Sequence, residues 1–298
     1  MASMRDIKRR RASIQSTGQI TKAMKLVSTV KLQRAKQNAE KVRTYFTCMY
    51  DTVQSLMQKS ANVMSTFIQG NGCEKKAVIL VTSNRGLAGG YNSNVVKLVQ
   101  SMEELKGAEL IAAGKKGKDA LVKRGYSLKE DFSDCMESPV YADAQAIGKT
   151  VLSAFEAGEI GELWIAYTAF KGTMTHVPTL IKLLPVDPEL DRGGERVSTE
   201  MFAPEAESAI NPMVPMNFEP PVSEALPMLI PKYITSMIYG ALMEAHASEN
   251  AARMQAMDNA TNNAEEMIDE LGLQYNRARQ GSITQELTEI IAGAEAIA

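Results

Sequence analysis

The segment SNRGLAGGYNSNVV, residues 83–96, comes nearest in residue types to a phosphate-binding loop. It follows an apolar run and opens a helical pattern, which is where a phosphate loop sits in an α/β domain. Its three glycines do not have the G-x-G-x-x-G spacing, however, and no Walker lysine is present. We interpret the segment as a tight strand-to-helix turn with Asn92 or Ser93 as the helix N-cap, and we keep nucleotide binding as the alternative.

Other candidate sites are weaker. AIGKT, residues 146–150, ends like a P-loop, but Asp143 stands where the first glycine of that motif belongs. His176 and His246 are the two histidines, and neither has a nearby partner with metal-ligand spacing. The three cysteines are far apart and odd in number, which argues against a disulfide framework or a metal cluster. The sequence therefore predicts no catalytic residue, cofactor site or metal site, and it favours a binding or mechanical role.

The residues before and after this central region predict long helices. Residues 3–69 contain no proline and are rich in Ala, Lys, Gln and Met, which favour helix. At about 1.5 Å per residue, such a helix is too long for a compact domain. Its apolar residues at narrow spacing predict a seam for a partner helix, formed by Ile7, Ile14, Ile20, Met24 and Val27.

The C-terminal residues predict a second long helix over residues 232–297. Pro231 stands just before its start, where proline is tolerated. Near the C-terminus, apolar residues recur at steps of three and four and form one stripe of a helix. We expect this stripe to be available to the first helix and to surrounding proteins; its members are Ile283, Leu287, Ile290, Ile291, Ala294 and Ile297.

The two predicted helices carry opposite charge. Residues 1–43 hold 12 Lys and Arg against 2 Asp and Glu, whereas residues 231–298 hold 4 against 10. Opposite charges favour the approach of the two segments at low ionic strength. The pattern predicts an antiparallel coiled coil, with two separate helices packed on the central domain as the alternative.

The central region predicts an α/β domain. Residues 76–82, 108–114 and 162–170 are short apolar runs typical of buried strands, and a further strand is expected near 176–184. Helical stretches near 92–105, 115–124 and 142–157 alternate with them, which indicates a largely parallel, Rossmann-like sheet. Residues 185–227 are rich in proline and are expected to form loops.

The sequence therefore predicts three parts. These are an N-terminal helix in residues 1–70, an α/β domain with a loop-rich return in residues 71–230, and a C-terminal helix in residues 231–298. No apolar run approaches the roughly 20 residues that cross a bilayer. Three scattered cysteines fit a reducing cytoplasm, although the basic, serine-containing start also has features of a mitochondrial transit peptide.

Four stretches resemble the gamma subunit of F-type ATP synthases. ITQELTEIIAGAEA (283–296) resembles that family's carboxy-terminal signature, and ITKAMKLVSTVKLQRA (20–35) resembles its amino-terminal helix. ASENAARMQAMDNATNNAEEMI (247–268) resembles its second long helix, and SNRGLAGGYN (83–92) resembles its first strand-to-helix turn. The chain departs from the common pattern at Ala88 and Asn84, where many relatives have Cys and Asp.

The resemblance implies a non-catalytic rotor subunit of the central stalk. Its two terminal helices would form a coiled coil inside a ring of alpha and beta subunits, and its α/β domain would lie against the epsilon subunit and the c-ring. Ion flow, of protons or sodium, would turn the rotor and drive the beta subunits through their conformations. Membrane association would be peripheral and through partners only, at the cytoplasmic face of a bacterial inner membrane in preference to the mitochondrial matrix side.

The resemblance also assigns contact residues. An acidic loop of the beta subunit is expected to meet a polar group on the last helix, because arginine offers a forked donor to carboxylates. Without the resemblance, the same residues would be read as a solvated helix face. The beta-subunit contacts implied are Arg279, Gln280, Thr284, Glu286, Glu289, Met24, Lys25 and Arg253, and the c-ring contact implied is Glu219.

The sequence leaves two alternative functions open. One is a stand-alone phosphate- or nucleotide-binding α/β protein with helical arms, using residues 83–92. The other is a nucleic-acid-binding coiled coil, because the first helix is basic. The absence of aromatic residues from IKRRRASIQSTGQITKAMKLVS, residues 7–28, argues against base stacking. We therefore expect no nucleic-acid partner.

Overall fold

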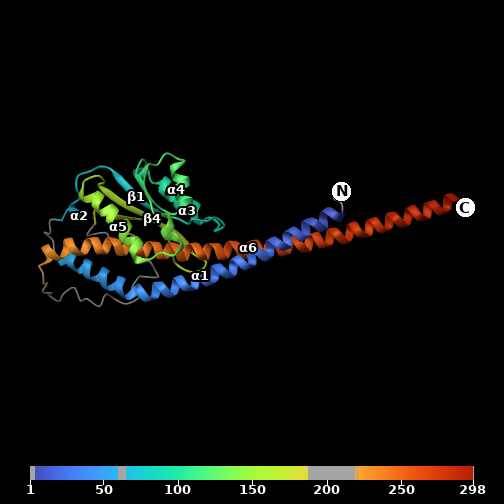
Figure 1. The fold of residues 1–298 in the computed structure, drawn as a ribbon, viewed down its shortest axis with the longest axis horizontal. Helices are drawn as coiled ribbons and strands as arrows, with labels where there is room; N and C mark the ends of the chain where they lie inside the picture. The colour runs from blue at the N-terminus through green and yellow to red at the C-terminus, as the bar shows by residue number, and fades with distance from the viewer. Residues whose placement is uncertain (1–3, 60–64, 187–218, 220, 298) are drawn as a thin grey trace. The chain divides into compact units, whose positions relative to one another are not determined.

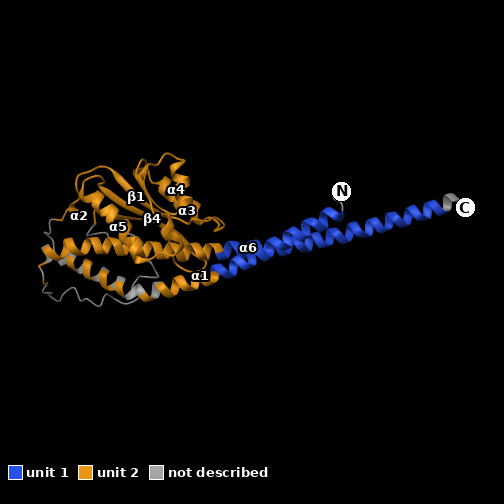
Figure 2. Cartoon of the chain, viewed as in Figure 1, with its two compact units in different colours: residues 1–28, 254–298 blue, residues 29–253 orange. Residues whose placement is uncertain are grey.

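The computed structural model describes residues 4–59, 65–186, 219 and 221–297 (Figure 1). They divide into two compact units (Figure 2). Unit 1 combines residues 1–28 with residues 254–298, and unit 2 is residues 29–253. Two long helices, α1 (Met4–Lys59) and α6 (Val222–Ile297), contribute to both units.

Unit 2 contains the predicted α/β domain. Its elements between α1 and α6 are, in chain order, α2 (Thr66–Gln69), β1 (Lys76–Val81), α3 (Tyr91–Ser101), η1 (Glu103–Leu105), β2 (Glu109–Ala113), α4 (Lys115–Val122), β3 (Leu128–Asp131), η2 (Ser133–Glu137), α5 (Tyr141–Glu156), β4 (Glu162–Phe170) and β5 (His176–Leu184). The four strands expected from apolar runs are confirmed, and β4 has the predicted bounds.

The five strands form one sheet in the order β3-β2-β1-β4-β5. The first four are parallel, and β5 runs antiparallel to β4. The chain crosses from β1 outward to β3 on one side and then returns through α5 to β4, so the strand order reverses between β1 and β4. In open α/β sheets this switch point is where ligands bind, at the carboxyl ends of the strands.

Each face of the sheet has its own core. On one face, Val78 and Leu80 of β1 pack with Val95 of α3 and Leu121 of α4. On the other face, residues such as Ile79 of β1 pack with α5 and with the N-terminal part of α6. Helices therefore cover both faces, which explains why the central strands are continuous apolar runs rather than alternating ones.

Gly114 ends β2 at a point where only glycine fits. Its φ is +129°, and a Cβ there would lie 2.0 Å from the Thr82 carbonyl oxygen. We predict that Gly114→Ala lowers the free energy of unfolding by at least about 3 kcal/mol, because strain and overlap add. Gly86→Ala is the control, since its Cβ would meet only the Lys116 Cε at 4.0 Å. Urea denaturation checks this prediction, and equal losses in the two variants would contradict it.

Helix α6 begins at Val222, before the predicted start, and contains Pro227 and Pro231. The loop expected over residues 222–227 is therefore wrong. The helix continues through Pro227 and Pro231, its sixth and tenth residues, although neither has an N–H for an intrahelical hydrogen bond. Thr235 donates its hydroxyl hydrogen to the Pro231 carbonyl oxygen at 2.8 Å. The predicted loop around DRGGER, residues 191–196, lies outside the described residues.

In unit 1, the N-terminal part of α1 pairs with the C-terminal half of α6. Buried and half-buried positions recur in both helices at steps of three and four, as in a coiled-coil seam. The hydroxyls of Thr21 and Thr261 are 2.8 Å apart. As the α1 residue number rises from Gly18 to Lys25, the α6 partner falls from Ala264 to Asp258, so the pairing is antiparallel, as expected.

Candidate functional site

The seam of unit 1 differs from the predicted one. Ile7 and Ile14 point toward α6 as expected, but Ile20 and Val27 are 59% and 58% exposed. The predicted seam was wrong there because it counted apolar residues only. From Gly18 onward, small and polar side chains keep the seven-residue spacing and take the inner positions, which leaves the larger apolar side chains on the outside.

The two α1 residues assigned to the beta subunit are placed differently from each other. Met24 is half-buried, whereas Val27, three residues further along α1, is exposed. Lys25 lies at the seam, and its Nζ donates to Asp258 Oδ1 at 2.5 Å. Lys25 therefore has a partner within unit 1, which the sequence-based assignment did not foresee.

The C-terminal end of α6 has no counterpart in the described part of α1. The seam spacing places Met4, the first described residue of α1, opposite Ala278. Beyond Ala278, Ser282 is half-buried, and every residue from Ile283 to Ala294 is exposed. Residues 279–297 continue as helix over about 28 Å at 1.5 Å per residue. The expectation that the apolar stripe contacts the first helix is therefore wrong for its described side chains.

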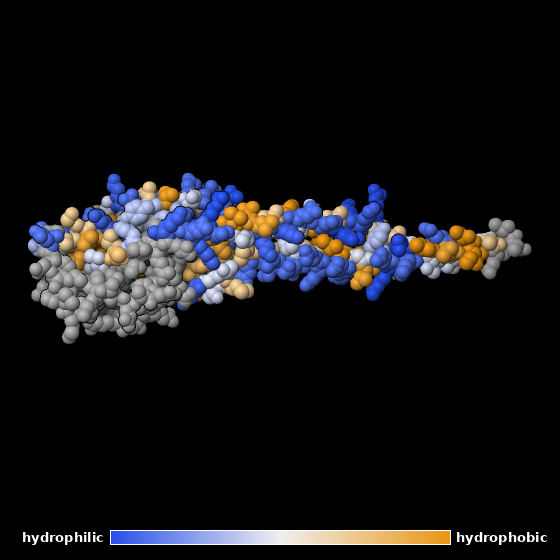
Figure 3. Space-filling model, turned by 90° about the horizontal axis from the view of Figure 1, so that it is seen from below, coloured by the Kyte–Doolittle hydropathy of each residue, from blue (hydrophilic) through white to orange (hydrophobic). Residues whose placement is uncertain are grey.

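Those apolar side chains are exposed. Ile283 and Leu287 are about half exposed, and Ile290 is 68% exposed. Figure 3 shows hydrophobic residues gathered at this end of α6. Isolated exposed apolar side chains are ordinary, but a continuous stripe on a helix marks a surface for another protein.

The polar residues assigned to the beta subunit surround this stripe. Arg279, Gln280, Thr284, Glu286 and Glu289 are all exposed. Thr284 donates its hydroxyl to the Gln280 carbonyl oxygen at 2.9 Å, and Glu289 accepts from Gln285 at 3.0 Å. At about 100° per residue, Thr284 and Glu289 are about 140° apart, so these polar side chains are distributed around α6.

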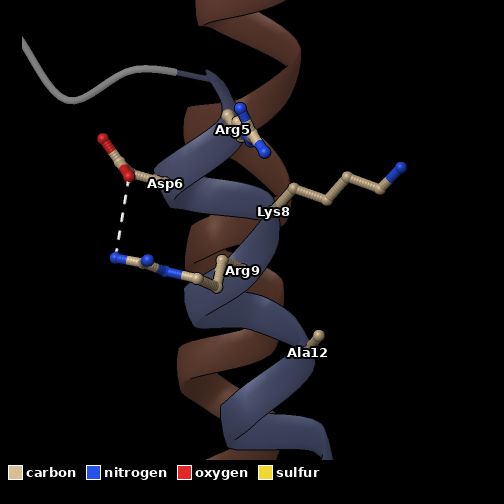
Figure 4. A pocket seen from close by; sticks show the side chains of 5 residues that line it. All are labelled: Arg5, Asp6, Lys8, Arg9 and Ala12. Carbon is tan, nitrogen blue, oxygen red and sulfur yellow. Dashed lines mark ion pairs between the residues drawn. The ribbon is translucent and has the colours of Figure 1, made fainter.

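The first turns of α1 carry a shallow hollow lined by Arg5, Asp6, Lys8, Arg9 and Ala12 (Figure 4). Arg9 lies 3.8 Å from Asp6, and both side chains are exposed. An exposed pair at this distance contributes little to stability. The hollow holds no nucleophile or general base paired with a second group, so it offers a basic contact surface and not an active site.

The turn after β1 uses its polar groups internally. Ser83 donates its backbone N–H to Asn92 Oδ1 at 2.9 Å and its hydroxyl to the Arg85 carbonyl oxygen at 2.5 Å. Asn84 donates to the Ser133 carbonyl oxygen at 2.7 Å. The predicted N-cap is wrong, because α3 begins at Tyr91 and Asn92 bonds back to Ser83. These donors are therefore not free to hold a phosphate.

The switch point beside this turn is packed with residues of α6. Tyr91 donates its hydroxyl to the Ala245 carbonyl oxygen at 3.0 Å, and burial raises the pKa of Tyr91 well above 10. Ala245 and Ser248 are fully buried. The crevice that binds a ligand in other open α/β sheets is filled by the chain's own helix, which argues against the nucleotide-binding alternative.

Arg253 is part of this internal packing. Its side chain is 11% exposed, and its Nη2 donates to Glu249 Oε1 at 2.7 Å and to the Gly86 carbonyl oxygen at 3.4 Å. Burial raises the pKa of Glu249, and the charge of Arg253 opposes this rise. Arg253 thus connects α6 to the turn, and a direct contact with another protein would require this pair to open.

Glu244 is the most unusual side chain in the packing of unit 2. It is fully buried, and neither carboxyl oxygen has a hydrogen-bond partner among the described residues. Burial raises its pKa well above 4.5, and the nearby Phe170 backbone N–H opposes the rise only in part. A buried carboxyl group without a cationic partner is stable only in its neutral form.

Sequence reasoning missed two sets of polar residues: Thr21, Thr261 and the partly exposed Asp258 at the seam of unit 1, and the buried Glu244 and Glu249 in unit 2. Heptad spacing of small and polar residues in both helices would have identified the first three. No sequence signal marks Glu244, since it lies in an ordinary helical stretch.

In the described part of the chain, no cluster of His, Cys, Asp and Glu side chains is arranged to hold a metal ion. Among the described helices, none is both long enough and apolar enough to span a membrane. Glu219, the predicted c-ring contact, is exposed.

The ATP synthase family model matches residues 3–297. The sequence is 60% identical over 299 residues to the ATP synthase gamma chain of Lachnoclostridium phytofermentans, covering 100% of both chains. It is 39% identical over 298 residues to the sodium-ion-specific ATP synthase gamma chain of Acetobacterium woodii, covering 99% of each.

Solved structures agree on the fold. A chain of the Euglena gracilis mitochondrial ATP synthase, described as OSCP/F1/c-ring in rotational state 3, aligns with a TM-score of 0.68. The alignment covers 99% of this chain and 94% of that one at 22% identity. A chain from the central stalk and c-ring of the Tetrahymena thermophila mitochondrial enzyme aligns with a TM-score of 0.56, covering 81% and 99% at 23% identity.

Proposed function

The chain belongs to the ATP synthase gamma chain family, and we propose that it acts as the central-stalk rotor subunit of an F-type ATP synthase. It couples ion-driven rotation of the membrane ring to conformational cycling of the catalytic beta subunits. The coupling ion is a proton or a sodium ion. The observation that carries this proposal is the end of α6 beyond Ala278, which is helical, unpaired with the described part of α1, and exposes both apolar and polar side chains.

The alpha and beta subunits surround unit 1 in this proposal. The apolar stripe at Ile283, Leu287 and Ile290 meets the sleeve that they form, and outward Ile20 and Val27 add to the same surface. Met, Ala, Ser and Thr side chains give the shaft a shallow surface that repacks during rotation. The epsilon subunit and the c-ring contact the α/β domain, with exposed Glu219 near the c-ring.

Arg279, Gln280 and Thr284 form the reversible grip on an acidic loop of the beta subunit. Arg279 and Gln280 present exposed donors, and arginine matches a carboxylate with two parallel hydrogen bonds. Glu286 and Glu289 adjust the local charge, and Met24 meets the moving part of the beta subunit. Each beta conformation is favoured only by its difference in contact energy with the shaft, so contacts must form and break with angle.

Lys25 and Arg253 have a structural role in addition to the proposed contact with the beta subunit. Lys25 bonds to Asp258 and Arg253 bonds to Glu249, so these residues first support the shaft itself. They contact the beta subunit along the part of each side chain that stays exposed, or when the internal pair opens.

The chain carries out no chemistry of its own and contributes to an enzyme complex. The internally used donors of the 83–92 turn and the filled switch point support this. It holds no cofactor or nucleic acid, and it reaches the cytoplasmic face of the bacterial inner membrane through its partners only. Lys25 of the basic first helix pairs with Asp258 of the acidic last helix within unit 1, which supports an internal role for the basic helix.

Calorimetry on the purified chain separates this proposal from a nucleotide-binding function. We expect no heat of binding with ATP, ADP or inorganic phosphate. Vesicles reconstituted with the remaining subunits, with and without the chain, test the proposal itself. We expect ion-driven ATP synthesis only when the chain is present; tight nucleotide binding, or synthesis without the chain, would overturn the proposal.

A further inference from the structure

Three neighbouring contacts in unit 1 define one register between α1 and α6. A Cβ on Gly18 would lie 3.4 Å from the Ala264 Cβ, which is close van der Waals contact. The hydroxyl oxygens of Thr21 and Thr261 are 2.8 Å apart, and both threonines are buried. Lys25 Nζ lies 2.5 Å from Asp258 Oδ1.

We propose that these three pairs form a register lock, which fixes how far α6 extends past the start of α1 and so positions Arg279 and Gln280. The register lock consists of Gly18, Thr21 and Lys25 of α1 with Ala264, Thr261 and Asp258 of α6. Its consequence for turnover rests on the rotor function proposed above, whereas its existence is a property of the chain alone. Its members are positioning residues and take no part in chemistry.

The rest of the seam does not select one register. The residue pairing of the lock places Ile14 of α1 opposite Ile268 of α6, with Leu271 one seam step away. Apolar side chains of similar size pack against each other after a shift of one seam step, so they stabilise several registers almost equally. Polar residues at the seam favour one register over the others, as a single polar seam position does in other coiled coils.

A shift of one seam step disrupts every pair of the lock. Thr21 would then face Met257 or Ala264, and its hydroxyl would lose the Thr261 hydroxyl as a partner. Each threonine would keep only its bond to its own helix, to the carbonyl oxygen of Gly18 or Met257. Lys25 would at the same time move away from Asp258.

The same shift moves the functional end of the shaft. One seam step of three or four residues is about 5 Å of helix. A hydrogen bond tolerates a change of a few tenths of an ångström, so a grip at Arg279 and Gln280 cannot form in the shifted register. A locked register is therefore needed for a contact made near the tip, many residues away from the lock.

Disulfide formation between seam residues outside the lock measures the register directly. The starting chain carries Cys48→Ser, Cys73→Ser and Cys135→Ala. Ile14→Cys with Ile268→Cys reports the observed register. Ile14→Cys with Leu271→Cys reports a shift in one direction, and Ile7→Cys with Leu271→Cys reports a shift in the other. We expect the first pair to oxidise at least about tenfold faster than the other two, since thiols far apart cannot be bridged.

Charge exchange separates a lock from a general effect of charge. Asp258→Lys places like charges together and should reduce the preference for the observed register. Lys25→Asp combined with Asp258→Lys restores the attraction in reverse and should restore the preference. Glu266→Lys is the matched control, because it makes the same charge change at an exposed position of α6 and should change nothing. An unchanged preference in Asp258→Lys, or no recovery in the exchanged pair, would overturn the lock.

ATP hydrolysis by the assembled complex tests the positioning role with the same variants. We expect Asp258→Lys to lower turnover by about tenfold and the exchanged pair to regain at least about threefold of that loss. Full recovery is not expected, because Lys25 is also proposed to contact the beta subunit. A shifted register with unchanged turnover would overturn the positioning role. Failure of the unchanged chain to support turnover would instead overturn the rotor function, while the disulfide result would still decide whether the lock exists.

Discussion

ATP hydrolysis by the assembled complex is expected to fall by about tenfold or more when Arg279 is changed to Leu, because a hydrogen bond to a charged partner contributes about 1.5–3 kcal/mol. Gln280→Leu should lower turnover by a smaller factor of roughly 2–10, because the Gln280 side chain is an uncharged donor and its hydrogen bond to the beta subunit is weaker than that of Arg279. Both residues are exposed on α6, and leucine favours helix, so the chain itself should fold normally. Steady-state turnover together with circular dichroism of each variant measures both parts of the prediction.

Arg277→Leu is the matched control for Arg279→Leu. Arg277 is also exposed on α6, but it lies about 160° around the helix from Arg279. It removes the same charge from the other side of the shaft and should change turnover little. Unchanged turnover in both Arg279→Leu and Gln280→Leu would show that the grip at this position does not contribute to coupling.

The second large effect concerns Glu244, whose replacement by Gln should stabilise the chain at neutral pH. Burial raises the folded-state pKa of Glu244, so the folded chain binds a proton that the unfolded chain releases above about pH 4.5. The stability that protonated Glu244 gives the folded chain is fully present below about pH 4.5. It is lost as the pH rises toward the folded-state pKa. The glutamine variant does not titrate, so its advantage should grow by up to about 1.4 kcal/mol per pH unit.

Urea unfolding of both chains between about pH 4.5 and 8.5 measures this difference. Glu224→Gln removes a carboxylate from an exposed position of the same helix and controls for the change in net charge. A difference between wild type and Glu244→Gln that stays constant over this range would contradict a buried neutral carboxyl group.

Most of the fold was predictable because its signals are local. Strands such as residues 162–170 are buried on both faces of the sheet, so they are recognisable in the sequence as continuous apolar runs. β3 was missed because LKED, at the edge of the sheet, is largely exposed and carries no apolar pattern. The start of α6 was misplaced because Pro227 and Pro231 signal a break, whereas the helix continues through both.

The interior of the coiled coil was less predictable. The apolar residues Ile20 and Val27 suggested a seam, yet they face outward while Gly18, Thr21 and Lys25 face α6. A prediction from apolar spacing assumes that the apolar side chains of a helix are buried only by its partner helix in the same chain. In a shaft that works inside another protein, the apolar residues serve an outer surface, and small or polar residues allow the two helices to approach.

The candidate contact residues show a similar limit. The resemblance pointed to Arg253 as a contact with another protein, but the structure pairs it with Glu249 and the Gly86 carbonyl oxygen. Such a pairing depends on α6 crossing the 83–92 turn, and no local pattern in residues 247–268 reveals that crossing. The exposed residues near the C-terminus, in contrast, were predictable as a group, because the periodicity there continues without interruption.

Rotation of the chain within the ring is the decisive test of the rotor function. Met174→Cys, in the exposed connection between β4 and β5, provides a labelling site in a chain with Cys48 and Cys73 changed to Ser. Cys135 can remain, because it is buried and burial raises its pKa to about 12, which keeps the thiol unreactive. With the alpha and beta subunits fixed to a surface and a bead attached to the introduced thiol, we expect continuous rotation in one direction when ATP is added. A bead that stays fixed while the complex hydrolyses ATP would contradict the rotor function.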